Sequence, residues 1–142
     1  MNGPREEQTA ALQVTRFDHI VINCRDVDIT AAWYERVLGM SRETFGPAAR
    51  TALTFGMQKI NLRPIAATQD EWFTGVAAAA GSDDLCFITG AAPAQVRAHL
   101  EACGVPIEQG PVTKIGALGE MTSHYYYCRD PDGNLIEIAV YP

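Results

Sequence analysis

The chain has 142 residues, a formal net charge of −6 and a sequence pI near 4.9. The length is that of one domain with a substantial core, and the acidity argues against nucleic acid or an anionic membrane surface as the main partner. No segment is long and apolar enough to span a bilayer, the N-terminus lacks the apolar run of a secretory signal, and the four cysteines form no Cys-x-x-Cys pair. We therefore expect a soluble, cytoplasmic protein with free thiols and with no nucleic-acid or membrane partner.

Residues 1–15 are polar and predict a flexible tail ahead of a first strand over about 17–23, which is rich in β-branched residues. A helix is expected over 29–38, with an aspartate cap before it and Gly39 in a left-handed position after it. The apolar face of this helix is predicted at Ile29, Trp33 and Val37. Three short strands complete a β-α-β-β-β pattern: residues 40–45, 50–55 and 59–63.

A linker over about 64–83 joins this pattern to a second one. The second pattern opens with a strand over 85–89 and a helix that begins at Pro93, a residue that suits the first turn of a helix. The glycines of residues 110–119 predict a mobile loop. Three more strands are expected: residues 105–108, 123–128 and 135–140.

The two patterns repeat at a fixed spacing. His19 precedes Gly39 by 20 residues, and Asp84 precedes Gly104 by the same 20 residues. A repeated unit makes a pseudo-symmetric fold in which a site between the halves can draw on both, so His19 and Asp84 are equivalent positions. The prediction is an α+β fold in a single domain over 16–141, with one βαβββ unit over about 16–64 and a second over about 84–141.

Strand alternation places Tyr125 and Tyr127 on one face, and the opposite face receives His124, Tyr126 and Cys128. Glu137 lies in an otherwise apolar strand, where a carboxylate needs a partner or a wet cleft. Plainer interpretations stay open: a core histidine at His19, a turn residue at Asp84, and simple strand packing for the tyrosines.

Several stretches together resemble the vicinal oxygen chelate superfamily, which includes glyoxalase I, extradiol dioxygenases, fosfomycin transferases and bleomycin-resistance proteins. They are the histidine in the first strand, the helix that closes on Val37-Leu38-Gly39-Met40, and the turn Asp130-Pro131-Asp132-Gly133-Asn134 that leads to Glu137. The chain is most similar to small glyoxalase-domain-containing proteins, over about residues 16–141. The resemblance implies a curled, mixed eight-stranded sheet around a cleft, with the helices outside.

The resemblance also implies a divalent metal, one of Mn, Fe, Ni, Co or Zn, held by His19, Asp84 and Glu137. Asn61 falls at the fourth ligand position of the family, where glyoxalase I carries a glutamate. Asp84 stands where ring-cleaving dioxygenases and fosfomycin transferases place a second histidine. None of the well-known reactions of the family therefore fits this donor set cleanly.

By the same resemblance Glu137, Tyr127 and Tyr125 are candidate catalytic residues. Four further residues are candidates for binding the substrate: Arg63, Asn61, Lys114 and Trp72. The favoured function is a metal-dependent lyase, isomerase or dioxygenase-like enzyme that acts on a small oxygen-rich substrate. The alternative is a metal-free protein that binds an antibiotic or metabolite on the same fold. A homodimer is expected on family grounds, and the sequence leaves open whether the site forms within one chain or across two.

Overall fold

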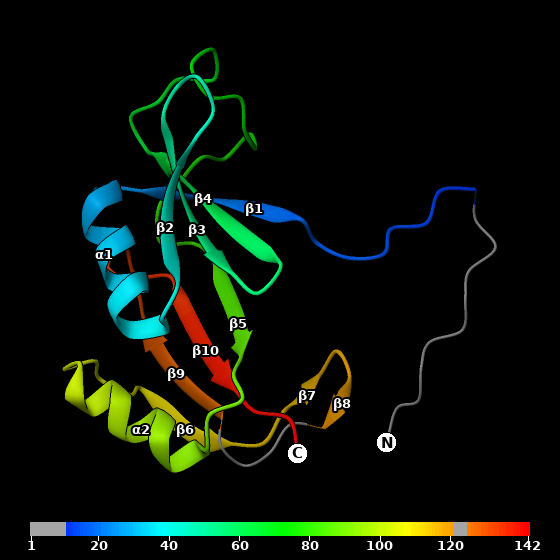
Figure 1. The fold of residues 1–142 in the computed structure, drawn as a ribbon, viewed down its shortest axis with the longest axis vertical. Helices are drawn as coiled ribbons and strands as arrows, with labels where there is room; N and C mark the ends of the chain where they lie inside the picture. The colour runs from blue at the N-terminus through cyan, green and yellow to red at the C-terminus, as the bar shows by residue number, and fades with distance from the viewer. Residues whose placement is uncertain (1–10, 121–124) are drawn as a thin grey trace.

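Two βαβββ units follow one another along the chain in the computed structural model, which describes residues 11–120 and 125–142 (Figure 1). The first unit comprises β1 (His19–Cys24), α1 (Val27–Leu38), β2 (Ser41–Phe45), β3 (Arg50–Phe55) and β4 (Gln58–Pro64). The second comprises β5 (Asp84–Ile88), α2 (Pro93–Ala102), β6 (Gln109–Val112), β9 (Tyr125–Arg129) and β10 (Leu135–Ala139). A small hairpin of β7 (Ile115–Gly116) and β8 (Gly119–Glu120) is inserted between β6 and β9.

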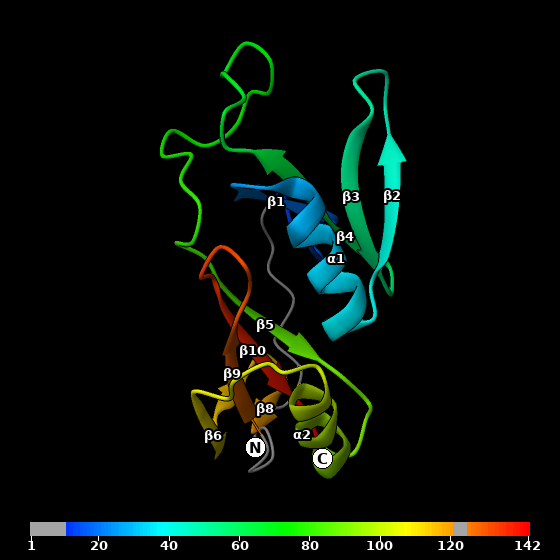
Figure 2. The same cartoon turned by 90° about the vertical axis from the view of Figure 1, so that its left-hand side faces the viewer.

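Each unit folds its four long strands into a mixed sheet with the same topology. The strand order is β1-β4-β3-β2 in the first sheet and β5-β10-β9-β6 in the second, and the first and last strands of each unit pair in parallel. The two sheets and helices share one continuous apolar core, in which Ile22, Leu53, Leu100 and Ile136 are all buried. The predicted α+β fold class is therefore confirmed. The eight strands of the two units form two four-stranded sheets, apart from the β7–β8 hairpin (Figure 2).

Helix α1 ends where its sequence predicts and begins at Val27, two residues before the predicted start. The side chain of Asp26 accepts a hydrogen bond from the backbone N–H of Ile29 (3.0 Å), and Gly39 ends the helix with a φ of 66°. The buried face was predicted partly wrong, because Ile29 is 59% exposed while Thr30 and Tyr34 are buried. The spacing of apolar residues did not predict this buried face, because Thr30 and Tyr34 carry polar groups and are buried by contacts with the second unit.

Those partners belong to the turn between β9 and β10, in which Asp130, Asp132 and Asn134 are buried. The Oδ2 of Asp130 accepts hydrogen bonds from the hydroxyl of Tyr34 (2.8 Å) and the Nδ2 of Asn134 (2.8 Å). The Oδ1 of Asp130 accepts from the backbone N–H groups of Asp132 (2.9 Å) and Asn134 (3.0 Å). Thr30 donates its hydroxyl proton to the Oδ2 of Asp132 (3.1 Å), so the turn ties the second sheet to α1 of the first unit.

The strand predicted over 105–108 is wrong, and the loop predicted over 110–119 instead holds most of β6 and the β7–β8 hairpin. Backbone pairing of Gln109 and Val112 with β9 overrides the turn preference of the local glycine and proline. The prediction of a flexible tail falls partly on residues 1–10, which lie outside the described residues, as does His124.

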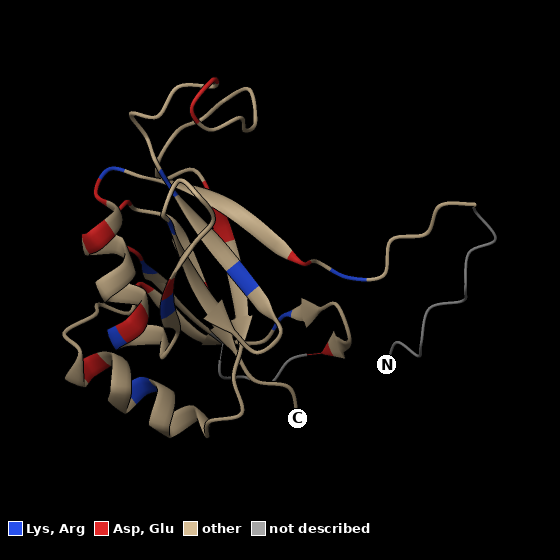
Figure 3. Cartoon of the chain, turned by 45° about the horizontal axis from the view of Figure 1, so that its top comes forward, with Lys and Arg blue, Asp and Glu red and all other residues tan. Residues whose placement is uncertain are grey.

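Charged residues of both signs are interspersed along the described chain (Figure 3). Among the described residues, no helix has the length and apolarity needed to cross a membrane. The cysteines are free thiols: Cys24, Cys86, Cys103 and Cys128.

Replacement of Tyr34 by Phe removes one of the donors that satisfy the buried carboxylate of Asp130. We expect the free energy of unfolding to fall by about 1–3 kcal/mol, because the lost partner is a hydrogen bond to a buried charged group. Urea denaturation of the variant measures this change. The matched control is Tyr141→Phe. Among the described residues, the Tyr141 hydroxyl accepts a hydrogen bond from the exposed backbone N–H of Leu118. A loss at Tyr34 no larger than the loss at Tyr141 contradicts the role of the Tyr34 hydroxyl.

Burial raises the pKa of the Cys24 thiol from 9.0 to about 12, and burial with the charge of Asp130 raises the pKa of Cys128 from 9.0 to about 11. Both raised values mean that the folded state keeps protons which the unfolded chain releases above pH 9. The stabilisation is full below pH 9 and is lost as the pH rises toward 11 and 12, so unfolding becomes easier with pH. Denaturation of wild type and Cys24→Ala across this window measures the slope, and an equal slope in both proteins contradicts the assignment to Cys24.

Candidate functional site

The first sheet carries one pair of candidate ligands at its parallel strand pair. In the β1–β4 register Val21 pairs with Asn61, and His19 lies two residues before Val21, so His19 and Asn61 share one face of adjacent strands. The Nδ1 of His19 donates to the Oδ2 of Asp18 (2.8 Å), which lowers the pKa of that carboxyl. A carboxylate at Nδ1 fixes the tautomer that presents Nε2 to a metal, an arrangement common around ligating histidines.

Asn61 is buried, with 6% of its surface exposed, and its Oδ1 has no hydrogen-bond partner among the described residues. A buried acceptor without a donor costs free energy, so such an atom is a candidate for contact with a cation or a ligand N–H. The sequence places Asn61 at the fourth ligand position of the family, and the oxygen without a partner is a signal that only the structure supplies. An amide oxygen is a suitable ligand for a hard or borderline divalent ion.

The second sheet repeats this arrangement in the same register. Cys86 of β5 pairs with Glu137 of β10, and Asp84 lies two residues before Cys86. Asp84 and Glu137 are therefore related to each other as His19 and Asn61 are. The repeat predicted from a 20-residue spacing is a repeat of strand register, and it divides the candidate ligands into two half-sites.

Around the second half-site the chain adds Tyr127 and Lys114. Tyr127 is the cross-strand partner of Glu137 on β9, while Tyr126 and Cys128 point into the core, as strand alternation predicts. The ammonium of Lys114 lies 5.8 Å from the centroid of the Tyr127 ring. The hydrogen bond to Tyr127, and then the charges of Glu137 and Asp84, raise the pKa of Lys114. Tyr125 begins β9, and its side chain lies outside the described residues.

Arg63 lies on the same face of β4 as Asn61 but is 1% exposed. It donates to the carbonyl of Trp72 (3.2 Å) and to the Oδ1 of Asn23 (2.9 Å), and its third contact is the carbonyl of Ala67 (2.6 Å). Trp72 is also buried, and Arg50 stacks over its ring at 4.0 Å. Arg63 therefore fastens the linker that carries Trp72 onto the first sheet. Its contact with a substrate stays a prediction that requires this linker to move.

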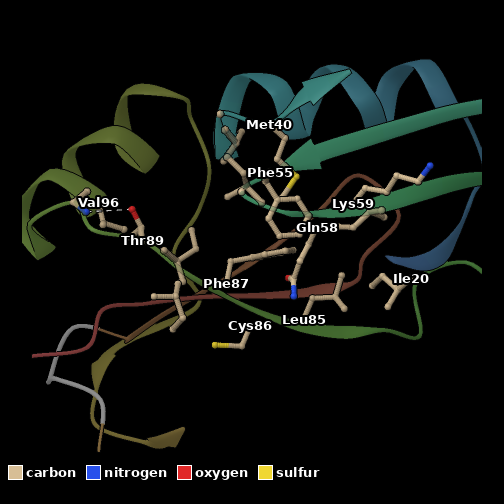
Figure 4. Close-up of a pocket in the computed structure, with 18 of the residues that line it drawn as sticks. Ile20, Met40, Phe55, Gln58, Lys59, Leu85, Cys86, Phe87, Thr89 and Val96 are labelled. Atoms are coloured by element: carbon tan, nitrogen blue, oxygen red, sulfur yellow. Dashed lines mark hydrogen bonds between the residues drawn. The ribbon is translucent and has the colours of Figure 1, made fainter. Parts of the chain in front are cut away.

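Between the two units lies a cleft of about 940 Å³, the inter-unit groove (Figure 4). His19 and Asp84 both line it, whereas Asn61 and Glu137 are not part of its lining. Most of its wall comes from the apolar faces of the strands, as the edge-to-face contact of Phe55 with Phe87 shows (centroids 5.5 Å apart). Within the described residues of one chain, no three His, Cys, Asp or Glu side chains converge closely enough to hold a metal ion.

The donor types nevertheless fit a divalent metal. An imidazole oriented by a carboxylate, an unpartnered amide oxygen and two carboxylates together suit a borderline or hard ion. What one chain lacks is the juxtaposition of the two half-sites. Joining them requires a change in the relative position of the sheets or a second copy of the chain.

The fastening of the linker by Arg63 is testable through Trp72. In a Trp33→Phe background, Arg63→Met is expected to increase acrylamide quenching of Trp72 and to lower the free energy of unfolding by about 2–4 kcal/mol, because one buried and two part-buried acceptors lose their donor. Arg97→Met is the control, since Arg97 makes only an exposed ion pair with Glu101. Quenching equal to that of the control contradicts the assigned role.

Comparison with known proteins agrees with this geometry. The family model described as the Glyoxalase/Bleomycin resistance protein/Dioxygenase superfamily matches residues 16–138. Virulence protein STM3117 of Salmonella typhimurium is 42% identical over 139 residues, which cover 96% of this chain and 92% of the relative. Glyoxalase domain-containing protein RDO1 of Mycosarcoma maydis is 41% identical over 137 residues, covering 96% and 74%. An integron cassette protein from the mobile metagenome of V. cholerae superimposes with a TM-score of 0.87 at 41% identity, covering 94% and 100%.

Two more distant structures share the fold alone. They are lactoylglutathione lyase from Agrobacterium tumefaciens (TM-score 0.67, 20% identity, covering 90% and 95%) and TnmS3, an antibiotic binding protein from Streptomyces (TM-score 0.69, 17% identity, covering 92% and 99%). The family match over most of the chain, the relatives above 40% identity and the repeated half-sites lead to one conclusion. The chain belongs to the glyoxalase/bleomycin resistance/dioxygenase superfamily.

Proposed function

We propose that the protein is a metal-dependent enzyme of the vicinal oxygen chelate type that acts on a small oxygen-rich substrate. The observation that carries the proposal is the equivalent register of the two half-sites, His19 with Asn61 and Asp84 with Glu137. The orientation of His19 by Asp18 and the orphaned Oδ1 of Asn61 support the same assignment.

In this proposal His19, Asp84 and Glu137 hold the ion, and Asn61 supplies a fourth oxygen or contacts the substrate. A divalent ion bound there supplies Lewis acidity toward two neighbouring oxygens of a substrate. Side chains of the protein would carry out proton transfer and orient the substrate. Glu137 is the candidate group for accepting or returning a proton, because it is the carboxylate that faces Tyr127 across the sheet.

Tyr127 and Lys114 together form the polar wall of the second half-site. The Lys114 ammonium is kept protonated by its neighbours, as the raised pKa indicates, and so offers a fixed positive charge to an anionic substrate oxygen. The Tyr127 hydroxyl orients the same oxygen, with Tyr125 as a second tyrosine on that strand. Trp72 closes the first sheet, in a position that Arg63 maintains.

The proposal includes a homodimer in which the first half-site of one chain meets the second half-site of its partner. Two features support it. The donors do not converge within the described residues of a single chain, and β1 and β5 are both edge strands with one side unpaired in their sheets. Unpaired edges are surfaces that a second chain can cover. The cytoplasmic location expected from the sequence belongs to the proposal, and the four free thiols support it.

The second candidate is a metal-free binding protein for an antibiotic or metabolite. Two observations favour it: the neutral Asn61 at a ligand position, and the large apolar inter-unit groove. A fold shared with an antibiotic binding protein is compatible with this candidate but does not select it.

Elemental analysis of protein purified without a chelator or a metal-binding tag separates the two candidates. We expect near-stoichiometric divalent metal in wild type, lost in His19→Ala and in Glu137→Gln because each removes a ligand. Glu101→Gln, at an exposed position of α2, is the control and keeps the metal. If the site is shared between chains, half of the dimers in a co-refolded equimolar mixture of the two ligand variants are mixed, and each mixed dimer has one intact site of its two. Such a mixture is therefore expected to regain about a quarter of the wild-type metal content.

Two results contradict the proposal. One is the absence of metal in wild type together with no thermal stabilisation by added Mn, Fe, Co, Ni or Zn, which favours the binding protein. The other is a metal that stays bound in both ligand variants. A mixture that regains no metal, while the single variants behave as expected, places the site within one chain.

A further inference from the structure

The inter-unit groove meets the half-sites at His19 and Asp84, and its apolar walls lie on the opposite strand faces. Leu85 and Phe87 of β5 line it, and Val96 and Leu100 of α2 form another wall (Figure 4). β5 is an edge strand, so one row of its backbone N–H and C=O groups faces no strand of its own sheet. A groove with apolar walls beside an edge strand suits an extended peptide segment, whose backbone pairs while alternate side chains fill the pockets.

Such a segment is present at the start of the described chain. Residues 11–18, here the N-terminal arm, lead away from the body of the molecule ahead of β1, and residues 13–18 carry no regular structure (Figure 1). The arm exposes apolar side chains to an unusual degree: Leu12 at 82%, Val14 at 82% and Phe17 at 71%. Leu12 and Val14 lie on one side of an extended chain, and the polar Gln13 and Thr15 lie on the other.

The dimensions of the arm and the groove agree. Eight extended residues span about 26 Å, more than the roughly 17 Å of a strand with the five residues of β5. The arm therefore reaches along the whole edge of β5 with Leu12 and Val14 directed to one side.

The base of the arm, Phe17 and Asp18, lines the groove of its own chain, and the rest of the arm leads away from the body of the molecule (Figure 1). The backbone N–H of Lys59 donates to the carbonyl of Asp18 (3.4 Å), which extends the β1–β4 ladder one residue beyond β1 and aligns the base of the arm with that strand. For Leu12 and Val14 to reach β5 of the same chain, the arm would have to reverse its direction near its base. A second copy can supply an arm without such a reversal.

We propose that the inter-unit groove receives the N-terminal arm of a second copy of this chain, which adds along the edge of β5. Leu12 and Val14 of the arriving arm pack against the apolar wall that contains Leu85 and Phe87. The inference rests on the homodimer of the proposed function, but it uses residues outside the half-sites. Its test is therefore independent of metal.

The first test measures the dimer in solution with full-length variants. Leu12→Ser combined with Val14→Ser is expected to raise the dimer dissociation constant at least about tenfold, because two buried apolar side chains are lost. Gln13→Ser combined with Thr15→Ser is the matched control, since these side chains lie on the opposite side of the arm, and its constant stays as in wild type. Sedimentation equilibrium gives both values. Equal constants for the two variants, or a wild type that is monomeric, overturn the proposal.

The second test identifies the chain that supplies the arm. Met57 lines the groove and is 82% exposed, so Met57→Cys places a thiol at its rim. One protein carries Val14→Cys and the other Met57→Cys, both with Cys86→Ser and Cys103→Ser so that the more accessible natural thiols are absent. After mixing and oxidation we expect a disulfide between the two different proteins. A bond that forms only when both cysteines are on one chain overturns the proposal.

A third measurement distinguishes an apolar small molecule as the occupant. The probe 1-anilinonaphthalene-8-sulfonate is expected to bind wild type weakly and the Leu12→Ser/Val14→Ser variant more strongly, because the variant uncovers the groove. Strong binding to wild type without change in the variant means that a small ligand, and not the arm, occupies the groove. Metal content measured on the same samples distinguishes the two proposals. Docking of the arm can be contradicted while the metal site is confirmed, and the metal site can be contradicted while docking of the arm is confirmed.

Discussion

The buried carboxylate of Asp130 is the point on which the arrangement of the two units depends. It receives donors from its own turn, from Asn134 and, across the molecule, from the hydroxyl of Tyr34. A charge without these donors would be costly to bury, so the turn, β10 and α1 are stable only together. Asp132 adds contacts to Thr30 and to the backbone N–H of Arg25 (3.0 Å). The turn between β9 and β10 thereby also determines how the first unit lies against the second.

This constraint has a direct bearing on the candidate site. Each half-site is built within a single parallel strand pair, whose register fixes the separation of its two ligands. The turn then holds the two strand pairs apart at a set position, with the inter-unit groove between them. Local geometry is thus set by strand register, whereas the meeting of the halves depends on the dimer of the proposed function. For this reason the sequence predicts the residue types of the candidate ligands but does not predict how the two half-sites lie relative to each other.

Much of the fold was predictable because its signals are local. Asp26 and Gly39 marked the ends of α1, residues 50–55 form a strand with the predicted bounds, and strand alternation placed Tyr127 opposite Tyr126. The misses have long-range causes. Tyr34 is buried because of a carboxylate 96 residues away, and β6 forms because β9 offers a partner. The pairing of His19 with Asp18 and the orphaned oxygen of Asn61 needed coordinates, since neither leaves a trace in residue spacing.

The linker between the units is fastened at both of its ends. At the near end Ile65 donates its backbone N–H to the carbonyl of Cys24 (2.9 Å), and Arg63 holds the segment up to Trp72. At the far end Gly81 has a φ of 83°, and a Cβ there would collide with the backbone carbonyl of Asp132. Thr74 and Gly75 are also hydrogen-bonded to Gln69, so a change in the length of this linker would disturb the fold least within residues 76–80. Insertions elsewhere would have to unfasten one unit from the other, which makes this short stretch the natural point for acquiring an extra segment without disturbing either half.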